Sequence, residues 1–292
     1  MYKVDNAVIM AAGTASRFAP LSYERPKALI EVKGEILLER QIEQLIEAGI
    51  KEIIVVVGYK KEQFLYLQEK YGVIIVENKE YLTRNNNSTI NAVRKYLKNT
   101  YICSSDNYFT KNPFESEVDD AYYAAVYSNG PTKEWCLTED EKGYIDSVNI
   151  GGENAWYMLG HTFWTEEFSK AFLEILDEVY DLPETVDLLW ESIYMKHLDK
   201  LKMKIRKYDD DFIFEFDTLD ELRTFDTTYV NDTRSIILKE VASELGCLES
   251  EIVEVKACKT GDNAASGMSF VLNGAEYTYT YNDKKLRRVE NA

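Results

Sequence analysis

The chain has 292 residues, of which 45% are hydrophobic and 13% aromatic, a composition typical of an ordinary soluble globular protein with enough material for a packed core. Its 51 acidic and 34 basic residues give a formal charge of -17, which argues against sequence-independent binding to nucleic acid or to an anionic membrane. Any site for a polyphosphate must therefore be a local basic patch.

The chain carries no recognisable targeting or membrane signal. Residues 1–6 lack the basic region that leads into a long apolar run in secretory leaders, and no stretch approaches the ~18 apolar residues of a membrane span. We therefore expect a cytoplasmic protein. The four cysteines have no CxxC spacing, which favours reduced, structural thiols. The two histidines, His161 and His197, are far apart, which argues against a catalytic histidine dyad.

The first hundred residues alternate short apolar runs with amphipathic stretches. Strands are predicted at 7–10, 53–57, 73–76 and 101–105, and helices at 36–48, 60–71 and up to residue 98, the last with N-cap side chains in the Asn-Asn-Asn-Ser run at 85–88. This alternation is typical of a parallel sheet with covering helices, an α/β fold of Rossmann-like type.

The pattern changes between residues 121 and 164 to alternating aromatic and polar residues, which predicts an antiparallel extension of the sheet that lines a pocket. Helices at 165–179 and 186–198, strands at 201–205 and 212–216, and a capping-box helix start at Thr218 and Glu221 follow. We expect a main domain over 1–229 and a small α+β appendage over 230–292, with a helix at 234–245 and strands near 252–258, 268–272 and 277–281.

The most informative segment is Ala-Ala-Gly-Thr-Ala-Ser-Arg at 11–17, which leaves the first strand and is followed by Pro26-Lys27. Small residues at the C-terminal end of a strand let several backbone N–H groups point at one phosphate. Arg17 can form a planar fork on phosphate oxygens and Lys27 adds a point charge, both suited to phosphoryl transfer. The segment favours a nucleoside triphosphate site over an ordinary turn with two surface cations, and its cradle residues are Ala12, Gly13, Thr14, Ala15 and Ser16.

Three acidic residues are candidates for a Mg²⁺ site. Asp106 follows the strand predicted at 101–105, where a metal-binding carboxylate belongs in such a fold. Glu215 and Asp217 are two residues apart on a predicted strand, so both side chains should share one face. Carboxylates converging on Mg²⁺ would let the metal bridge triphosphate oxygens during in-line attack. The alternatives are a turn role for Asp106 and a helix N-cap role for Asp217.

Aromatic residues of the second half of the chain suggest a site for a cationic group. Trp135, Trp164 and Trp190, with Tyr157, offer ring faces that can box a quaternary ammonium, at roughly 0.5–2 kcal/mol for each cation–π contact. The acidic residues Glu134 and Asp187 would add a favourable field. A single tryptophan is more often a core residue, but the set together favours a cationic head group.

The 11–17 segment with Pro26-Lys27 resembles the A-A-G-x-G-[ST]-R … P-K signature of sugar-phosphate and alcohol-phosphate nucleotidyltransferases. The resemblance implies the nucleotide-diphospho-sugar transferase type of fold. Ala15 stands where that family usually has its second glycine. Alanine costs little there if φ is negative and more if the loop requires a positive φ.

Across residues 5–228 the chain is similar to the bacterial phosphocholine cytidylyltransferases. The similarity lies in residues 11–27, Val57-Gly58-Tyr59, Asn86-Asn87-Ser88, 105–108, Glu134-Trp135, 186–190 and 214–217. It implies that CTP and phosphocholine react to give CDP-choline and pyrophosphate, and it strengthens the metal roles of Asp106, Glu215 and Asp217. It further implies nucleotide contacts from Gly13, Gly58, Tyr59, Asn87 and Ser88, a phosphate contact from Lys27, and choline contacts from Trp135, Asp187 and Trp190.

Residues 253–272 and 274–281 resemble the opening strands of bacterial choline and ethanolamine kinases, around a glycine-bearing loop. The chain stops before any catalytic aspartate of a kinase, so we expect no kinase activity. A kinase fragment, a docking module and a stabilising β-appendage remain alternatives.

Three other functions remain open on sequence grounds. The acceptor can instead be 2-aminoethylphosphonate or phosphoethanolamine, whose primary ammonium prefers carboxylates to an aromatic box, or it can be a sugar 1-phosphate. A non-catalytic nucleotide-sensing subunit is the alternative from another class. The sequence does not fix the oligomeric state, and a homo-oligomer is compatible with it.

Overall fold

The computed structural model describes residues 1–259 and 265–289, and the chain divides into two compact units. The first contains Met1–Gly13 and Leu38–Glu215, and the second contains Thr14–Leu37 and the chain from Phe216 onward. These units differ from the expected 1–229 and 230–292 division, because residues 14–37 pack with the C-terminal segment. Tyr23, for example, stacks on Tyr281 with 4.0 Å between ring centroids.

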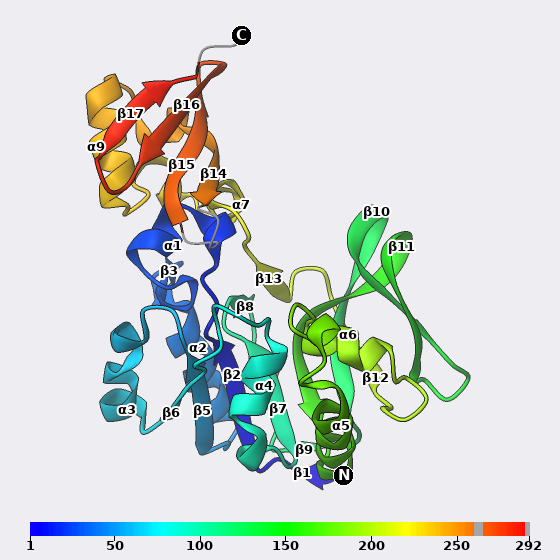
Figure 1. Ribbon diagram of the computed structural model, residues 1–292. Coiled ribbons are helices and arrows are strands. Elements are labelled where there is room, and N and C mark those ends of the chain that lie inside the picture. The colour runs from blue at the N-terminus through cyan, green and yellow to red at the C-terminus, as the bar shows by residue number, and fades with distance from the viewer. Residues whose placement is uncertain (260–264, 290–292) are drawn as a thin grey trace. The chain divides into compact units, whose positions relative to one another are not determined.

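A seven-stranded sheet in the order β12-β10-β11-β7-β2-β5-β6 forms the centre of the first unit (Figure 1). β2, β5, β6 and β7 run parallel to one another, and β11 is antiparallel to both β7 and β10. This confirms the mostly parallel fold with an antiparallel extension. The strand bounds are β2 Asn6–Ala11, β5 Glu52–Val57, β6 Ile74–Glu77, β7 Thr100–Ser104, β10 Tyr122–Glu139, β11 Ile145–Trp164 and β12 Lys204–Tyr208.

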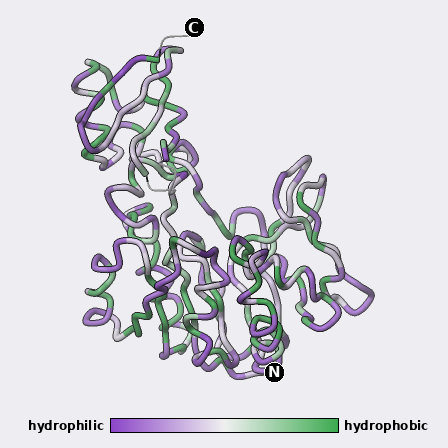
Figure 2. The backbone as a smooth tube through the Cα atoms, in the orientation of Figure 1, coloured by the Kyte–Doolittle hydropathy of each residue, from purple (hydrophilic) through white to green (hydrophobic). Residues whose placement is uncertain are grey.

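Burial explains why these segments are strands. β2 and β5 are almost continuously buried, as parallel strands covered on both faces must be, and Figure 2 shows their hydrophobic character against polar connecting loops. Helices α2 Leu37–Glu47, α3 Tyr66–Tyr71, α4 Asn87–Ala92, α5 Glu166–Val179 and α6 Trp190–Met195 accompany the sheet. No helix in the described part of the chain is long and apolar enough to cross a membrane.

Three helices are shorter than the sequence predicted. The helix expected at 60–71 is α3 Tyr66–Tyr71, preceded by a 3-10 turn at Lys61–Phe64. The helix expected up to residue 98 ends at Ala92 and gives way to a 3-10 turn, η4 Arg94–Tyr96, and the helix expected from residue 186 begins only at Trp190. The N-cap prediction for 85–88 is also wrong, because Asn86 makes no side-chain cap hydrogen bond. Its Oδ1 instead accepts the Trp190 backbone N–H at 2.7 Å.

The strands β10 and β11 are much longer than their neighbours and continue beyond the sheet as a twisted ribbon (Figure 1). Register shifts between Tyr123 and Glu139 mark bulges that increase its twist. Beside the sheet, β8 Asn107–Phe109 pairs antiparallel with β13 Ile213–Glu215. This pairing brings Glu215 opposite Asn107, the residue after Asp106.

The second unit joins the 14–37 segment to helices and a four-stranded antiparallel sheet. The predicted capping box at Thr218 and Glu221 is confirmed at the start of α7. β17 was not foreseen, and residues 260–264, which include the glycine-bearing loop of the kinase resemblance, lie outside the described residues. The bounds are η1 Ser16–Phe18, α1 Leu21–Glu24, η2 Lys27–Leu29, β3 Glu31–Val32, β4 Glu35–Ile36, α7 Leu219–Phe225, α8 Thr228–Asn231, α9 Ile236–Leu245, η6 Glu249–Glu251, β14 Val253–Lys259, β15 Ala265–Leu272, β16 Ala275–Thr280 and β17 Lys285–Arg288.

Arg223 should be a main determinant of the second unit's stability. Its guanidinium is buried and donates to the carbonyl oxygens of Ile252 and Glu249, each at 2.7 Å. Arg223→Met leaves both carbonyls unpaired, so we expect a loss of about 2–4 kcal/mol in the free energy of unfolding, measured by denaturant titration. Arg94→Met, which removes an exposed ion pair with Asp177, should cost less than about 1 kcal/mol. Equal losses in both variants would contradict this role.

Candidate functional site

The loop that follows β2 contains the backbone strain that was expected if Ala15 required a positive φ. Ala15 adopts the left-handed conformation with φ 45°, directly before η1. A side chain in this region costs roughly 1–2 kcal/mol, which accounts for the glycine of the related signature. Gly13 is exposed, and no neighbouring atom lies within 4 Å of the position that a Cβ would take. The loop therefore keeps an open surface beside its small residues.

The two cations predicted to bind phosphate share one carboxylate within the second unit. Arg17 Nη1 lies 2.7 Å from Asp217 Oδ2, and Lys27 Nζ lies 3.6 Å from Asp217 Oδ1. Arg17 is largely exposed, whereas Lys27 is buried, with Nζ 5.7 Å from the centre of the Phe18 ring. The structure thus brings Arg17 and Lys27 together on an anion, the arrangement that phosphate oxygens would require.

The sequence predicted that Asp217 and Glu215 share one face of a strand. The structure shows that they do not. β13 ends at Glu215, because the chain turns there toward the capping box of α7 and Asp217 N–H donates to Glu221 Oε2 at 2.6 Å. The two carboxylates belong to different compact units. Thr218, not Asp217, is the N-cap of α7.

Gly58 and Tyr59 do meet the loop after β2 within the first unit. The Tyr59 N–H donates to the Ala12 carbonyl at 3.1 Å. A Cβ on Gly58 would lie 2.8 Å from that carbonyl oxygen and 2.6 Å from the Tyr81 ring, so only glycine allows this close approach. These two residues fix the backbone of the loop at its start.

The side chains of Asn87 and Ser88 are buried and already bonded to the protein. Asn87 Nδ2 donates to the carbonyls of Thr185, at 2.9 Å, and Leu188, while Ser88 Oγ donates to the Asn85 carbonyl at 2.8 Å. Asn87 thereby holds the 185–188 segment against α4, and Ser88 closes a local turn with Asn85. The nucleotide contacts that the resemblance implied for them stay a prediction.

Asp106 and Glu215 are the carboxylates of the first unit that the sequence assigned to a metal. Glu215 lies opposite Asn107, whose Nδ2 is 3.4 Å from Glu215 Oε2. Among the described residues no group of three or more acidic, histidine or cysteine side chains forms a ready metal cage. Mg²⁺ usually takes one or two carboxylates together with substrate phosphates, so this donor set fits Mg²⁺ better than a tightly caged ion.

The predicted aromatic box is only partly available. Trp164 and Trp190 are 0% and 1% exposed and pack with each other and with Phe172 in the core of the first unit. Their faces are covered, which corrects their assignment as cage walls. Trp135 and Tyr157 on the hairpin are half-buried, and Glu134 and Asp187 are exposed.

Two residues of this region escaped the sequence analysis, Tyr123 and Glu191. The Tyr123 ring stacks on Trp190 at 5.9 Å, and its hydroxyl donates to Glu191 Oε1 at 3.4 Å. Burial raises the pKa of Glu191 from its ordinary value of 4.5 to about 7, and burial also holds the pKa of Tyr123 well above its usual value. The available signal was a glutamate directly after a core tryptophan at the start of a helix.

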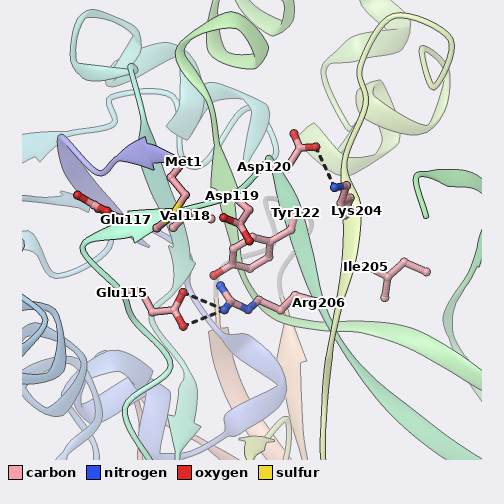
Figure 3. Close-up of a pocket in the computed structure, with 10 residues that line it drawn as sticks. All are labelled: Met1, Glu115, Glu117, Val118, Asp119, Asp120, Tyr122, Lys204, Ile205 and Arg206. Carbon is pink, nitrogen blue, oxygen red and sulfur yellow. Dashed lines mark hydrogen bonds and ion pairs between the residues drawn. The ribbon is translucent and has the colours of Figure 1, made fainter. Parts of the chain in front are cut away.

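A separate cavity of about 390 Å³ in the first unit contains none of these predicted residues. Figure 3 shows Arg206 reaching both oxygens of Glu115, and Lys204 paired with Asp120 across the opening. Its basic side chains are therefore already neutralised by protein carboxylates. The candidate residues lie elsewhere: beside β8, in β13 and at the start of α6 in the first unit, and at Arg17, Lys27 and Asp217 in the second unit.

Comparison with known proteins identifies the family. The MobA-like NTP transferase domain matches residues 7–115. A choline-phosphate cytidylyltransferase of Streptococcus pneumoniae is 33% identical, covering 77% of this chain and 99% of that protein. A 2-aminoethylphosphonate cytidylyltransferase of Lancefieldella rimae is 36% identical, covering 79% and 95%. The chain belongs to this family of cytidylyltransferases.

Solved structures agree with this assignment. A CTP:phosphocholine cytidylyltransferase from Streptococcus pneumoniae matches with a TM-score of 0.74 and 33% identity, covering 78% of this chain and 99% of that one. An inositol-1-phosphate CTP transferase from T. maritima, at 17% identity and a TM-score of 0.59, shows the shared fold alone. This cytidylyltransferase is therefore a nucleotidyltransferase enzyme, and the predicted family and fold are confirmed. The kinase resemblance of the C-terminal segment stays a prediction.

The raised pKa of Glu191 gives a pH test of its burial. The folded state binds a proton between pH 4.5 and 7 that the unfolded state does not, so the protein loses stability as the pH rises through this window. Glu191→Gln should lack this loss. The free energy of unfolding of the variant minus that of the unmodified protein should therefore be larger at pH 8 than at pH 5 by on the order of 1–3 kcal/mol, measured by denaturant titration. The exposed Glu167→Gln should show no such change, and a flat difference for Glu191→Gln would contradict the shift.

Proposed function

We propose that this cytidylyltransferase transfers the cytidylyl group of CTP to phosphocholine, giving CDP-choline and pyrophosphate. The observation that carries the proposal is the Arg17 and Lys27 pair held on one carboxylate beside the small-residue loop. The choline-phosphate cytidylyltransferase that covers most of the chain supports this acceptor. A phosphate monoester is largely dianionic at pH 7, so the protein needs to align the reactants and neutralise charge without a general base.

In this proposal the triphosphate takes the place of Asp217 as the anion that Arg17 and Lys27 contact. Arg17 offers a planar fork to non-bridging oxygens, and the buried Lys27 gives a charge that screening weakens little. Asp106 and Glu215 of the first unit are proposed to hold Mg²⁺, which supplies positive charge for phosphate groups. The metal role of Asp217 in the second unit stays a prediction. Trp135 and Asp187 are assigned to the acceptor side.

A specific observation favours a second acceptor, 2-aminoethylphosphonate. Trp164 and Trp190 offer no open ring face, which removes two of the three tryptophan walls of a quaternary ammonium box. A carboxylate with a raised pKa, Glu191, lies nearby and suits a hydrogen-bonding primary ammonium. The 36% identical relative from Lancefieldella rimae is named for this acceptor.

The residues from 230 onward are proposed to stabilise the second unit. The Ile237 N–H donates to Glu24 at 3.0 Å, and Arg234 Nη1 donates to the Glu31 carbonyl at 3.3 Å, so this segment packs on the same 14–37 stretch that carries Arg17 and Lys27. These contacts are those expected of a β-appendage, one of the three sequence-based alternatives.

Pyrophosphate release from CTP and Mg²⁺ tests the function. We expect release with phosphocholine, run beside 2-aminoethylphosphonate, phosphoethanolamine and glucose 1-phosphate. Release only with an aminoethyl acceptor would move the second candidate to first place. Release only with the sugar phosphate would overturn both. CTP binding without any release would instead support a nucleotide sensor.

Asp106 tests the assignment of the metal carboxylates. Asp106→Asn should lower kcat by more than ~100-fold, because an amide neutralises metal charge far less than a carboxylate does. The thermal unfolding midpoint should stay within about 2 °C of the unmodified protein, since Asp106 is only half-buried at the end of a strand. The exposed Asp177→Asn is the matched control and should retain full activity. Near-normal turnover in Asp106→Asn would exclude a metal role.

A further inference from the structure

Glu191 is a carboxylate inside the first unit with no cation beside it in the described chain. Its two oxygens accept from Asn86 Nδ2 at 3.1 Å and from the Tyr123 hydroxyl at 3.4 Å, and both donors are neutral. The charged form is disfavoured by desolvation, and no lysine, arginine or histidine offsets it. Glu191 is half-buried, and a partly desolvated carboxylate without a counter-charge is unfavourable, so this position is suited to a cation that arrives from outside.

The surroundings of Glu191 increase the negative potential instead of relieving it. Tyr123 lies in the field of both Glu191 and Glu215, and Tyr157 lies in the field of Glu134 and Glu215. These residues come from β10, β11, β13 and α6 of one unit, so the carboxylates gather around two tyrosines of the hairpin. This part of the hairpin therefore combines aromatic side chains with negative charge, which is the chemistry that binds ammonium groups.

We propose that Glu191 determines acceptor specificity by binding the ammonium group of the acceptor, with the Tyr123 hydroxyl as its positioning partner. This inference rests on the proposed function, whose acceptors all carry an ammonium group except the sugar phosphate. A cationic acceptor supplies the missing counter-charge, whereas a neutral acceptor of the same shape leaves the carboxylate unpaired. A primary ammonium also donates a hydrogen bond to Glu191, and a quaternary one makes only a charge contact.

Glu191→Gln isolates the charge, because glutamine keeps an oxygen that can accept from Asn86 and an amide N–H that can donate to the Tyr123 hydroxyl. Each cationic acceptor is compared with a neutral isostere: phosphocholine with 3,3-dimethylbutyl phosphate, and 2-aminoethylphosphonate with propylphosphonate. We expect KM for the cationic acceptors to rise at least 10-fold in Glu191→Gln, while KM for CTP and for the neutral isosteres stays within 2-fold. Tyr123→Phe should raise KM for the cationic acceptors about 3-fold. Glu167→Gln, an exposed glutamate on α5, is the matched control and should change nothing.

Equal changes in KM for cationic and neutral acceptors would overturn the inference, as would equal use of both by the unmodified protein. Absence of pyrophosphate release with every acceptor would refute the proposed function instead. In that case, calorimetric titration of the same acceptors in the presence of CTP and Mg²⁺ tests the role of Glu191 in binding. Cation-selective binding that Glu191→Gln loses would still support it, and binding without charge preference, or none, would overturn it. Unchanged thermal unfolding of Glu191→Gln at pH 5 verifies that the variant is folded.

Discussion

Three consecutive asparagines provide the constraint on which the acceptor side of the first unit depends. The Asn85 N–H donates to the Val186 carbonyl, Asn86 accepts from the Trp190 N–H, and Asn87 donates to the Thr185 carbonyl. Buried backbone groups must find partners, and these bonds supply them for the 3-10 turn that ends at Thr185 and for the turn and loop that follow it up to Leu189. They delay the start of α6 to Trp190 and thereby direct that ring into the core and Glu191 toward Tyr123.

The charged side chains of the candidate residues are paired within the protein in the second unit, whereas Glu191 in the first unit has no oppositely charged partner. In the second unit, Asp217 neutralises Arg17 and Lys27, which keeps the two cations together. In the first unit, Glu191 accepts hydrogen bonds from neutral donors. In the proposed function, phosphate replaces Asp217 on the cationic pair, and the ammonium group of the acceptor pairs with Glu191. Preformed pairing lowers the cost of desolvating cations, whereas an unpaired carboxylate makes selectivity depend on the ligand's own charge.

The sequence predicted what short-range patterns determine. Apolar runs located β2, β5, β6 and β7, and the small-residue segment with Arg17 and Lys27 led to the family that the comparisons confirm. The start of α6, the covered faces of Trp164 and Trp190, and the separation of Asp217 from Glu215 were not predictable in this way. Each depends on hydrogen bonds or packing that the local pattern does not show. The Trp190 N–H donates to Asn86, Phe172 packs on Trp164, and the Asp217 N–H donates to Glu221.

The covered tryptophans and the unpaired Glu191 together change how this protein can discriminate between ammonium groups. A quaternary ammonium gains mainly from open ring faces, at roughly 0.5–2 kcal/mol each, and Trp135 is the half-buried member of the three predicted tryptophans. A primary ammonium gains from a charge-assisted hydrogen bond, which is roughly twice as strong as a neutral one. Under the proposed role of Glu191, a half-buried carboxylate beside few open ring faces attracts both ammonium groups, and it favours the aminoethyl acceptor more than a full aromatic box would.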